Sequence, residues 1–569
     1  MPISMTLLLF IVWSSSSVNG VEPVMIIPRP LLVSQSSGAP FVLAADTVIH
    51  AADDTAGPVA GWLQEMLAVT AGVSLAVDAE RDGLGIVLSL ESDLGIGETE
   101  WAQAEAYRLT VSSGQVRIAA RSAHGLFNGC TTLIQLPRVD EDGVSLPALV
   151  IEDAPRFRWR GLMLDCSRHF FTVAEVKRFI DLLALHKFNR FHWHLTDDPG
   201  WRVEVHAKPK LTSVGAWRSE SPVMGDASVG DGQPYGGFYT QDDIRAVVAH
   251  AASRQVTVVP EIEMPGHSSA TIAAYPEIGN HDVPDWQPPQ PASLNGIKHT
   301  VLSPREETFA FIEAVFDEIL PLFPGEYVHI GGDEAPKAEW NASPFAQEVI
   351  AQHGLKDAHE LQAWFIGRVE AILAKRGKRL IGWDEIQEGG LSPSATMMVW
   401  RKWEWAVHAL ERGNCVVMAP ESHTYFDYRQ PDTPDLPQFQ TIGSEHWRPM
   451  TSNERVFQFE PIPEGTSEER AANVLGAQGQ LWTEYIWSQA KLEYMTWPRS
   501  CILAECIWSG PERDWADLSA RLEQHLLLLR RLDVNFRCAD GQPAFPGRSL
   551  DRTPRPPPAD AGPGSSTQP

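Results

Sequence analysis

The amino-acid sequence predicts an α/β protein in which a (β/α)8 TIM barrel follows a small α/β domain with a mainly antiparallel sheet. The first observation is an alternation of short apolar runs and amphipathic stretches that begins at residue 160. Eight such runs fall within about 350 residues, and eight parallel strands close a barrel of this kind. The second observation is that the preceding segment has strand-like runs joined by turn residues, which is typical of hairpins.

Composition limits the classes of protein to which the chain can belong. Its 569 residues exceed one ordinary domain, and 43% hydrophobic against 21% charged residues indicates a globular chain with a large core. A formal charge of −27 argues against nucleic acid or an anionic membrane surface as the partner, because both attract basic patches. Six cysteines without CxxC spacing argue against a disulfide scaffold and a structural zinc site. Disulfide pairing and oligomeric state stay open.

The two ends of the chain differ from the rest. An apolar run at residues 6–13 followed by small residues predicts a signal peptide over residues 1–20, and hence export to the periplasm or the medium. This run is too short for a membrane span, and no other run is long enough. Residues 541–569 are rich in proline and glycine, which predicts a disordered tail. The α/β domain is expected over 21–153 and the barrel over 154–540.

The individual elements follow from periodicity and capping residues. In the first domain, strands are expected within 73–77, 85–90, 107–120 and 146–153, and helices over 57–72 and 124–136. The barrel strands are expected at 160–165, 190–195, 256–262, 327–332, 379–383, 396–400, 415–419 and 474–479. Thr172 and Glu175 form a capping box before an amphipathic helix, and Ser303, Pro304 and Glu306 mark another helix start.

A barrel of this kind carries its chemistry just after the carboxyl ends of the strands. Polar or aromatic residues follow every predicted strand, although each one alone has a structural explanation as a helix cap or a polar loop residue. They are Asp165, Arg168, Asp197, Glu263, His267, Asp333, Glu334, Trp383, Trp400, Tyr425, Asp427, Trp482 and Glu484.

The segment VHIGGDEAP, residues 328–336, places two adjacent carboxylates after a strand and two glycines. Neighbouring carboxylates repel, so at least one of Asp333 and Glu334 is expected to have a raised pKa, as a general acid near neutral pH requires. The alternative is that Asp333 caps the following helix and Glu334 is solvated.

The segment FHWHLTDDPGWR, residues 191–202, places His192 and His194 on the same side of a strand, just before Asp197. This pattern fits a zinc site, a hydrogen-bonded network that supports an acid elsewhere, or buried histidines with satisfied partners. His267 follows a Pro-Gly turn in PEIEMPGH and could pair with Asp197 to tune the protonation of a carboxylic acid.

The chain has 20 tryptophans, and three of them, Trp383, Trp400 and Trp482, fall at predicted strand ends. Flat apolar walls around a few directed polar groups suit a sugar ring, whose C–H faces pack on aromatic side chains. Arg168 offers a fixed fork of donors to hydroxyls or carboxylates, or it forms a salt bridge with Asp165. Core packing is the alternative for each tryptophan.

Together these segments resemble glycoside hydrolase family 20, the β-N-acetylhexosaminidases. The resemblance covers roughly residues 155–510, and the preceding α/β unit looks like the small N-terminal domain of that family. The matching segments, in the family's order, are RGLMLDCSRHF, NRFHWHLTDD, PEIEMPGH, HIGGDEAP, IGWDEI, HTYFDY and GQLWTEY.

The resemblance implies a role for each matching residue. Glu334 matches the general acid/base, and Asp333 matches the carboxylate that orients the substrate's acetamido group and offsets its developing charge. Tyr425 matches the hydrogen-bond donor to the acetamido carbonyl, and Asp197 with His267 matches the pair that supports the acid. The remaining matches bind or enclose the sugar: Arg168, Glu484 and Asp427 at its hydroxyls, and Trp383, Trp400 and Trp482 as walls.

The family resemblance further implies an exo-acting hydrolase that releases terminal N-acetylglucosamine or N-acetylgalactosamine with retention, through an oxazolinium formed by the substrate itself. It implies no cofactor and no catalytic metal. Two other classes stay open: a metal-dependent amidohydrolase built on His192, His194 and Asp333, and a carbohydrate-binding protein without catalysis. The intact Asp333–Glu334 pair and Tyr425 argue against the latter. The choice between the two sugars and the natural glycan stay open.

Overall fold

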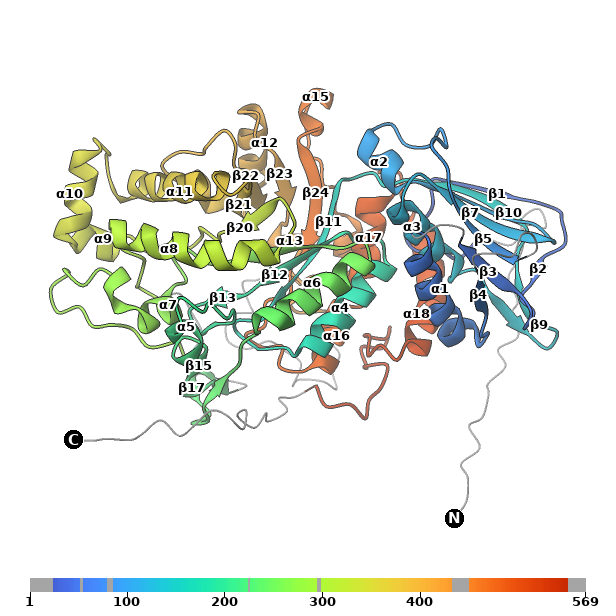
Figure 1. The fold of residues 1–569 in the computed structure, drawn as a ribbon, viewed down its shortest axis with the longest axis horizontal. Coiled ribbons are helices and arrows are strands. Elements are labelled where there is room, and N and C mark those ends of the chain that lie inside the picture. Colours follow the sequence, from blue (N-terminus) through green and yellow to red (C-terminus); the bar gives the residue numbers. More distant parts are fainter. Residues whose placement is uncertain are drawn as a thin grey trace, which may run out of the picture.

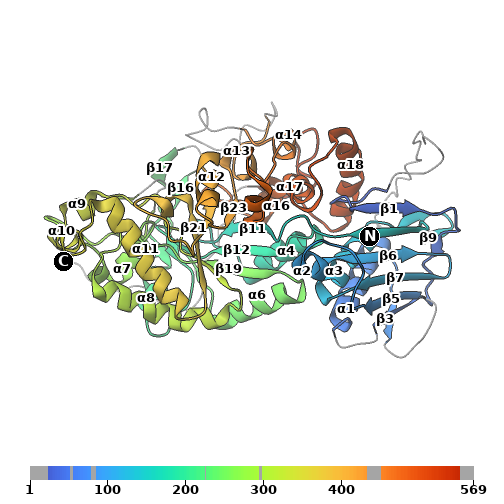
Figure 2. The ribbon, with the colours of Figure 1, turned by 90° about the horizontal axis from the view of Figure 1, so that it is seen from above.

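The computed structural model describes residues 24–51, 55–78, 85–223, 226–293, 298–431 and 450–550 (Figure 1). The predicted signal peptide and the tail beyond residue 550 lie outside these ranges. Within them the chain forms a closed barrel and, beside it, a smaller α/β domain at the N-terminal end (Figure 2).

Eight parallel strands close the barrel in chain order, and all eight strands predicted from the sequence are confirmed. Each is buried along nearly its whole length, because helices or loops cover the outside and side chains fill the inside. The strands are β11 (Trp159–Asp165), β12 (Arg190–His194), β19 (Thr257–Glu261), β20 (Tyr327–His329), β21 (Arg379–Trp383), β22 (Thr396–Val399), β23 (Val416–Met418) and β24 (Val474–Gly479).

Helices surround the barrel at most positions. The predicted capping box is present, since the Thr172 hydroxyl accepts a bond from the Glu175 amide while the Glu175 carboxylate accepts one from the Thr172 amide. The helix expected to start at Ser303 starts instead at Glu306, after Arg305, whose side chain makes no capping bond. The principal helices are α4 (Val173–Leu185), α6 (Gln241–Ser253), α8 (Glu306–Ile319), α11 (Ala358–Ala374), α12 (Trp403–Glu411), α17 (Arg499–Trp508) and α18 (Trp515–Arg531).

Short elements occupy the loops, and a 3-10 helix stands after β21 where a full helix would be expected. These are β13 (Thr196–Asp197), β14 (Gly200–Trp201), α5 (Lys210–Ser213), β15 (Trp217–Arg218), β16 (Pro222–Val223), β17 (Asp226–Gly230), β18 (Tyr235–Gly236), α7 (Ser269–Ala274), η1 (Pro276–Ile278), η2 (Leu320–Leu322), α9 (Ala338–Ala342), α10 (Pro344–Gln352), η3 (Asp384–Gln387), α13 (Glu421–Thr424), α14 (Asn453–Phe457), α15 (Glu468–Ala471) and α16 (Gln489–Thr496).

The N-terminal domain has a seven-stranded sheet in the order β1-β10-β6-β7-β5-β3-β4, with α1 and α3 packed on it. The pairs from β1 to β7 are antiparallel, and those from β7 to β4 are parallel. A separate antiparallel sheet has the order β2-β9-β8. The elements are β1 (Leu32–Gln35), β2 (Phe41–Val42), β3 (Val48–Ala51), α1 (Gly57–Ala71), β4 (Ala76–Asp78), β5 (Gly85–Leu90), α2 (Glu100–Glu105), β6 (Tyr107–Val111), β7 (Gln115–Ala120), α3 (Ala123–Leu133), β8 (Arg138–Asp140), β9 (Gly143–Leu146) and β10 (Leu149–Asp153).

A buried ion pair and buried hydrogen bonds connect this domain to the barrel. Lys187, just after α4, places Nζ 2.8 Å from Oδ2 of Asp153 at the end of β10, and both side chains are fully buried. Tyr107 and Trp508 also donate hydrogen bonds to Asp153. Because burial of a charge is costly unless it is paired, this cluster fixes the two domains in one arrangement.

The C-terminal end differs from the sequence prediction. Residues 541–550, expected to begin the disordered tail, pack on the molecule: Ala544 and Leu550 are buried, and the Tyr494 hydroxyl donates to the Gly541 carbonyl at 2.6 Å. Among the described residues, none of the helices combines the length and the apolar character needed to cross a bilayer.

Candidate active site

Asp333 and Glu334 lie in the turn after β20, behind Ile330 and two glycines whose backbone is left-handed, with φ of 66° at Gly331 and 86° at Gly332. A β-carbon at Gly331 would lie 1.7 Å from Oε2 of Glu263, so a side chain has no room there. Glu334 itself has φ of 43°, an uncommon conformation for a residue other than glycine. The glycines therefore allow the chain to turn sharply and present both carboxyl groups at the mouth of the barrel.

The two neighbouring carboxyl groups have different environments. Asp333 is almost completely buried, and burial is the main reason that its pKa rises to about 7. The Glu334 side chain is 33% exposed, and although burial acts to raise its pKa, the hydrogen bond and charge of His267 outweigh it and lower the pKa. One raised pKa was expected from the sequence, and the structure assigns it to Asp333.

His267 links these carboxyl groups to a second acidic pair. Its Nε2 lies 3.4 Å from Oε2 of Glu334 and 3.6 Å from Oδ2 of Asp333. Its Nδ1 donates to Asp198 at 3.1 Å and lies 3.3 Å from Asp197. Burial opposes a charge on His267, but these acidic groups outweigh it and hold its pKa well above the usual range. The predicted pairing of His267 with Asp197 is present, and Asp198 is an additional partner.

Arg168 lies on the other side of Asp197. Its guanidinium is 2.9 Å from Oδ2 of Asp197 and 3.4 Å from Oδ2 of Asp165, and it stacks on the Trp482 ring at 4.9 Å. Burial raises the pKa of Glu484, and the charge of Arg168 acts in the opposite direction. Arg168 therefore forms the salt bridge to Asp165 and also lies beside the site residues Asp197 and Trp482. The sequence left these two positions as alternatives.

Three tryptophans and a tyrosine form a continuous aromatic wall. Ring centroids are 5.6 Å apart for Trp383 and Trp482, 6.4 Å for Tyr425 and Trp482, and 6.0 Å for Tyr425 and Trp400. Burial raises the pKa of Tyr425 well above its usual range, and the nearby charge of Asp427 adds to this effect, so the phenol remains a hydrogen-bond donor. All eleven predicted site residues thus belong to one connected region.

The two strand histidines do not join Asp333 in the site that the amidohydrolase hypothesis requires. Both turn to Glu261: His194 donates from Nδ1 at 2.5 Å, and His192 lies 2.8 Å away. His329 lies 2.7 Å from the same carboxylate, and the Trp383 indole donates to it at 2.9 Å. Within the described residues, the groups close enough to share an ion place His192 with Glu261 and His329, and none of them includes Asp333.

Burial and the network around Glu261 give His192 and His194 different charges. Burial opposes a charge on His194, but Glu261 and Asp197 on its two ring nitrogens raise its pKa to about 10. Burial lowers the pKa of His192 to about 4, so this ring is neutral. The sequence left the hydrogen-bonded network and the burial of the two histidines as separate hypotheses, and the structure shows both.

Two more acidic residues lie near the site: Glu263, which the sequence placed after a strand without giving it a role, and Glu385, which it did not single out. Both oxygens of Glu263 lack a hydrogen-bond partner among the described residues, and burial together with the charge of Asp333 raises its pKa well above the usual range. Glu385, after β21, accepts from the Trp400 indole at 3.0 Å and pairs with Arg401 at 3.1 Å. Their position after strand ends was the available signal, but acidic residues are common in such loops.

A pocket of about 580 Å³ opens beside this region. Glu334 and Trp400 lie in its wall, so it adjoins the acid and the aromatic residues. Its remaining lining residues are mostly charged or polar: His299, Ala335, Pro336, Lys337, His359, Glu385, Glu388 and Arg401. The arrangement can donate and accept a proton next to a ring held between aromatic walls, with a buried carboxylate to stabilise positive charge.

Comparison with known protein families identifies the family of both domains. Residues 157–511 match the model of the glycosyl hydrolase family 20 catalytic domain, and residues 24–154 match that of domain 2 of the same family. The chain is 38% identical over 538 residues to a beta-hexosaminidase of Porphyromonas gingivalis, covering 92% of this chain and 66% of that protein. A beta-N-acetylhexosaminidase of Cellulomonas fimi is 34% identical, with 92% of this chain and 98% of the relative covered.

Solved structures of the same family have a similar fold. A family 20 exo beta-N-acetylglucosaminidase of Vibrio harveyi in complex with N-acetylglucosamine superposes with a TM-score of 0.78 at 34% identity, covering 90% of this chain and 78% of that one. A Streptomyces plicatus N-acetyl-beta-hexosaminidase gives 0.75 at 32% identity, covering 90% and 96%. With the barrel, the paired carboxyl groups and both domain matches in agreement, the chain belongs to glycosyl hydrolase family 20 and is a glycoside hydrolase.

Proposed function

We propose that the protein is an exo-acting β-N-acetylhexosaminidase that releases terminal, non-reducing N-acetylglucosamine or N-acetylgalactosamine from glycans or chitooligosaccharides. The observation that carries this proposal is the Asp333–Glu334 pair, in which one carboxyl group is buried and the other faces the pocket beside Trp400. The curated names of the relatives support the same substrate class.

In the proposed reaction the substrate supplies its own nucleophile. The acetamido oxygen attacks the anomeric carbon as the glycosidic C–O bond breaks, and Glu334 gives its proton to the leaving oxygen. The product of this step is a cyclic oxazolinium ion, whose positive charge the Asp333 carboxylate offsets. Water then attacks the anomeric carbon and breaks its bond to the acetamido oxygen, while Glu334 takes a proton from that water, and the sugar leaves with its original configuration.

The other residues hold the substrate in the reactive geometry. The Tyr425 phenol donates to the acetamido oxygen, and Trp383, Trp400 and Trp482 enclose the ring and the acetamido group. Arg168, Glu484 and Asp427 bind hydroxyl groups of the terminal sugar. Asp197 and His267 are positioning residues, because they act on the substrate through Glu334 and Asp333.

Glu334 has to gain its proton when the substrate binds. In the free protein His267 lowers the pKa of this carboxyl group, whereas an acid catalyst must be protonated. A sugar that covers the exposed part of Glu334 removes water from it, and loss of water raises the pKa of a carboxyl group. Binding thus turns Glu334 into the acid that the first step needs.

The test is the release of 4-nitrophenol from its N-acetyl-β-glucosaminide, compared with the β-glucoside that lacks the acetamido group. Only the first is expected to be hydrolysed. Glu334→Gln is expected to lower kcat by about 10²- to 10⁴-fold and Asp333→Asn to slow it severely, while Glu307→Gln, at an exposed position, serves as control. Near-normal rates in both site variants would refute the assignment.

An oxazolinium mimic tests the mechanism separately from the substrate class. N-acetyl-glucosamine-thiazoline is expected to inhibit competitively, and a lack of inhibition would remove the substrate-assisted mechanism. A panel of aryl N-acetylglucosaminides, aryl N-acetylgalactosaminides and chitooligosaccharides then gives the sugar and linkage preference. We further propose that residues 1–20 direct export, which N-terminal sequencing of the mature chain tests.

A further inference from the structure

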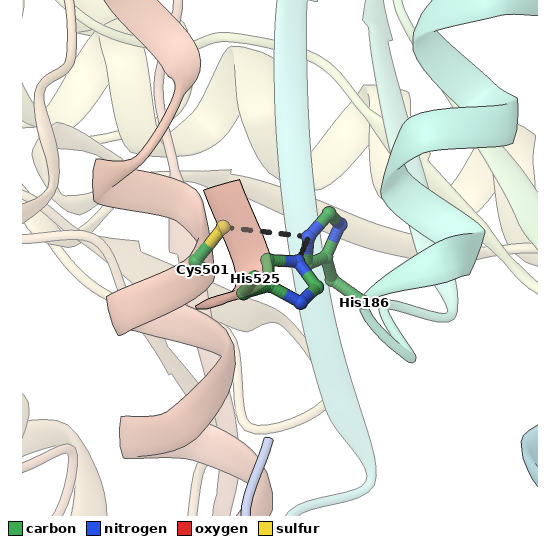
Figure 3. Close-up of side chains that lie close together, drawn as sticks. All are labelled: His186, Cys501 and His525. Atoms are coloured by element: carbon green, nitrogen blue, oxygen red, sulfur yellow. Dashed lines mark hydrogen bonds between the residues drawn. The ribbon is translucent and has the colours of Figure 1, made fainter. Parts of the chain in front are cut away.

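Three side chains from three helices converge away from the active site, at the junction of the two domains (Figure 3). His186 caps the end of α4, Cys501 lies in α17 and His525 lies in α18. The two Nε2 atoms of the histidines are 2.8 Å apart, and the Cys501 sulfur is 3.4 Å from Nε2 of His186. All three residues are buried, at 2% exposure or less.

The other ring nitrogen of His186 fixes its tautomer. Its Nδ1 lies 2.7 Å from the Leu182 carbonyl, which can only accept a hydrogen bond. Nδ1 therefore carries the proton, and Nε2 of the neutral ring presents a lone pair.

His525 has the same tautomer, because the orientation of Gln135 is fixed. The Gln135 amide nitrogen donates to the carbonyls of Ile27 and Thr131, and its Oε1 accepts from the Ile27 amide. This Oε1 lies 3.1 Å from Nδ1 of His525, so Nδ1 donates to it and Nε2 presents a lone pair.

Two lone pairs thus face each other at hydrogen-bond distance, which is repulsive unless a cation lies between them. The cation can be a proton, taken from the Cys501 thiol to leave a thiolate, or a metal ion. Separated charges are unfavourable here, because all three side chains are buried away from water. A metal ion is bound by the neutral rings and the thiolate directly.

We propose that His186, Cys501 and His525 bind a d¹⁰ metal ion, Zn²⁺ or Cu⁺, as a structural site. One thiolate and two imidazoles are donors that both ions accept, and Zn²⁺ would take a water molecule as its fourth ligand. Each histidine also donates its other ring N–H to a carbonyl or amide oxygen, the arrangement that orients metal-bound histidines. Tetrahedral zinc with Zn–N bonds of about 2.0–2.1 Å would need the two nitrogens roughly 3.3 Å apart. They are now 2.8 Å apart, so zinc binding requires only a small movement of the two rings away from each other.

The place of the cluster indicates what the ion would do. Gln135 follows α3 of the N-terminal domain, whereas the three proposed ligands come from barrel helices. An ion here would stabilise the contact between the domains and take no part in sugar hydrolysis. The sequence predicted no structural zinc because its argument rested on CxxC spacing, and these ligands are hundreds of residues apart.

The experiment measures metal bound by the full chain after removal of any affinity tag. The protein is unfolded in the presence of a chelator and refolded with ZnCl₂, or with Cu⁺ under reducing conditions. After dialysis, the bound metal is measured by inductively coupled plasma mass spectrometry. One equivalent of one ion is expected, with an X-ray absorption spectrum that shows one sulfur and two nitrogen neighbours. The metal-free refolded protein is expected to melt several degrees lower.

Variants locate the site. Cys501→Ser is expected to lose the ion, whereas Cys506→Ser, which removes another buried thiol of the same helix, is expected to keep it. Since sulfur coordination is read from the wild-type chain, the result stands even if Cys501→Ser fails to fold. A wild-type chain that refolds without either ion, or whose bound ion has no sulfur neighbour, would overturn the proposal in favour of an imidazolium–thiolate pair.

Discussion

The Nε2 atom of His267 lies 3.4 Å from the carboxylate of Glu334. The same ring faces Asp197 and Asp198 through Nδ1, so carboxylates hold it from both sides. With its pKa held well above the usual range, His267 stays positively charged at neutral pH, and it places that charge next to both members of the catalytic pair.

Replacing His267 with asparagine is expected to shift the acidic limb of the kcat/KM profile to higher pH. Burial already raises the pKa of Asp333 to about 7, and the charge of His267 opposes that rise. Without this charge the pKa of Asp333 rises further, and a higher pH is needed to ionise it. We expect kcat/KM at pH 6 to fall by about 10²-fold or more, measured with an aryl N-acetyl-β-glucosaminide.

A matched control separates this effect from a general loss of structure. His206→Asn alters a histidine whose side chain is 67% exposed, and its pH profile should coincide with that of the wild type. A His267→Asn enzyme with reduced activity but an unshifted acidic limb would contradict the electrostatic role of the imidazolium.

Asp333→Asn is expected to stabilise the fold while it slows the reaction. An aspartate whose folded pKa lies above its unfolded value makes the native state bind more protons than the unfolded state, so stability falls as pH rises between the two values. For Asp333 this window runs from the unperturbed value near 3.8 to about 7. Above it the wild type carries the full cost of the buried charge, and the amide removes that cost.

Urea denaturation at several pH values measures this difference. The gain from Asp333→Asn should be of the order of 2–4 kcal/mol at pH 8 and should shrink as the pH falls toward 4. Asp242→Asn, at a side chain that is 93% exposed, provides the reference. A gain that does not depend on pH would mean that Asp333 is not the source.

The strand ends show how far sequence reasoning reaches. Each barrel strand was recognisable, because parallel strands buried on both faces read as short apolar runs, and this placed Asp333, Tyr425 and Trp482 at one end of the barrel. Their common location therefore followed from topology alone. The pairing within that end did not, since it depends on which side chains turn toward one another.

Glu261 illustrates what could not be predicted. Its partners come from three other segments of the chain, His192 and His194 on β12, His329 on β20 and Trp383 on β21. Nothing local in PEIEMPGH distinguishes this carboxylate from Glu263 two residues later, whose oxygens have no such donors among the described residues. The histidine and tryptophan donors meet Glu261 and not Glu263 only because the barrel closes.

Glu261→Gln is expected to destabilise the protein by about 3 kcal/mol or more. The substitution keeps the shape of the side chain but removes the charge that holds the protonated ring of His194, and an unpaired buried charge costs about 3–5 kcal/mol. Denaturation at neutral pH measures the loss. Glu307→Gln is the exposed control, and equal stability of the two variants would mean that the network contributes no net stabilisation.

Gly331→Ala is expected to abolish activity and lower stability by roughly 2 kcal/mol or more, since the new β-carbon would occupy the position of the Glu263 carboxylate and would strain a left-handed backbone. Relief of the clash has to move either Glu263 or the turn that carries Asp333 and Glu334.

Gly367→Ala is the matched control: this glycine is exposed in the interior of α11 with open space around it, so alanine should stabilise the helix by about 0.5–1 kcal/mol. Thermal unfolding and turnover of both variants test the argument. A fully active Gly331→Ala enzyme would show that the turn after β20 tolerates a side chain and that the two glycines do not position the catalytic pair.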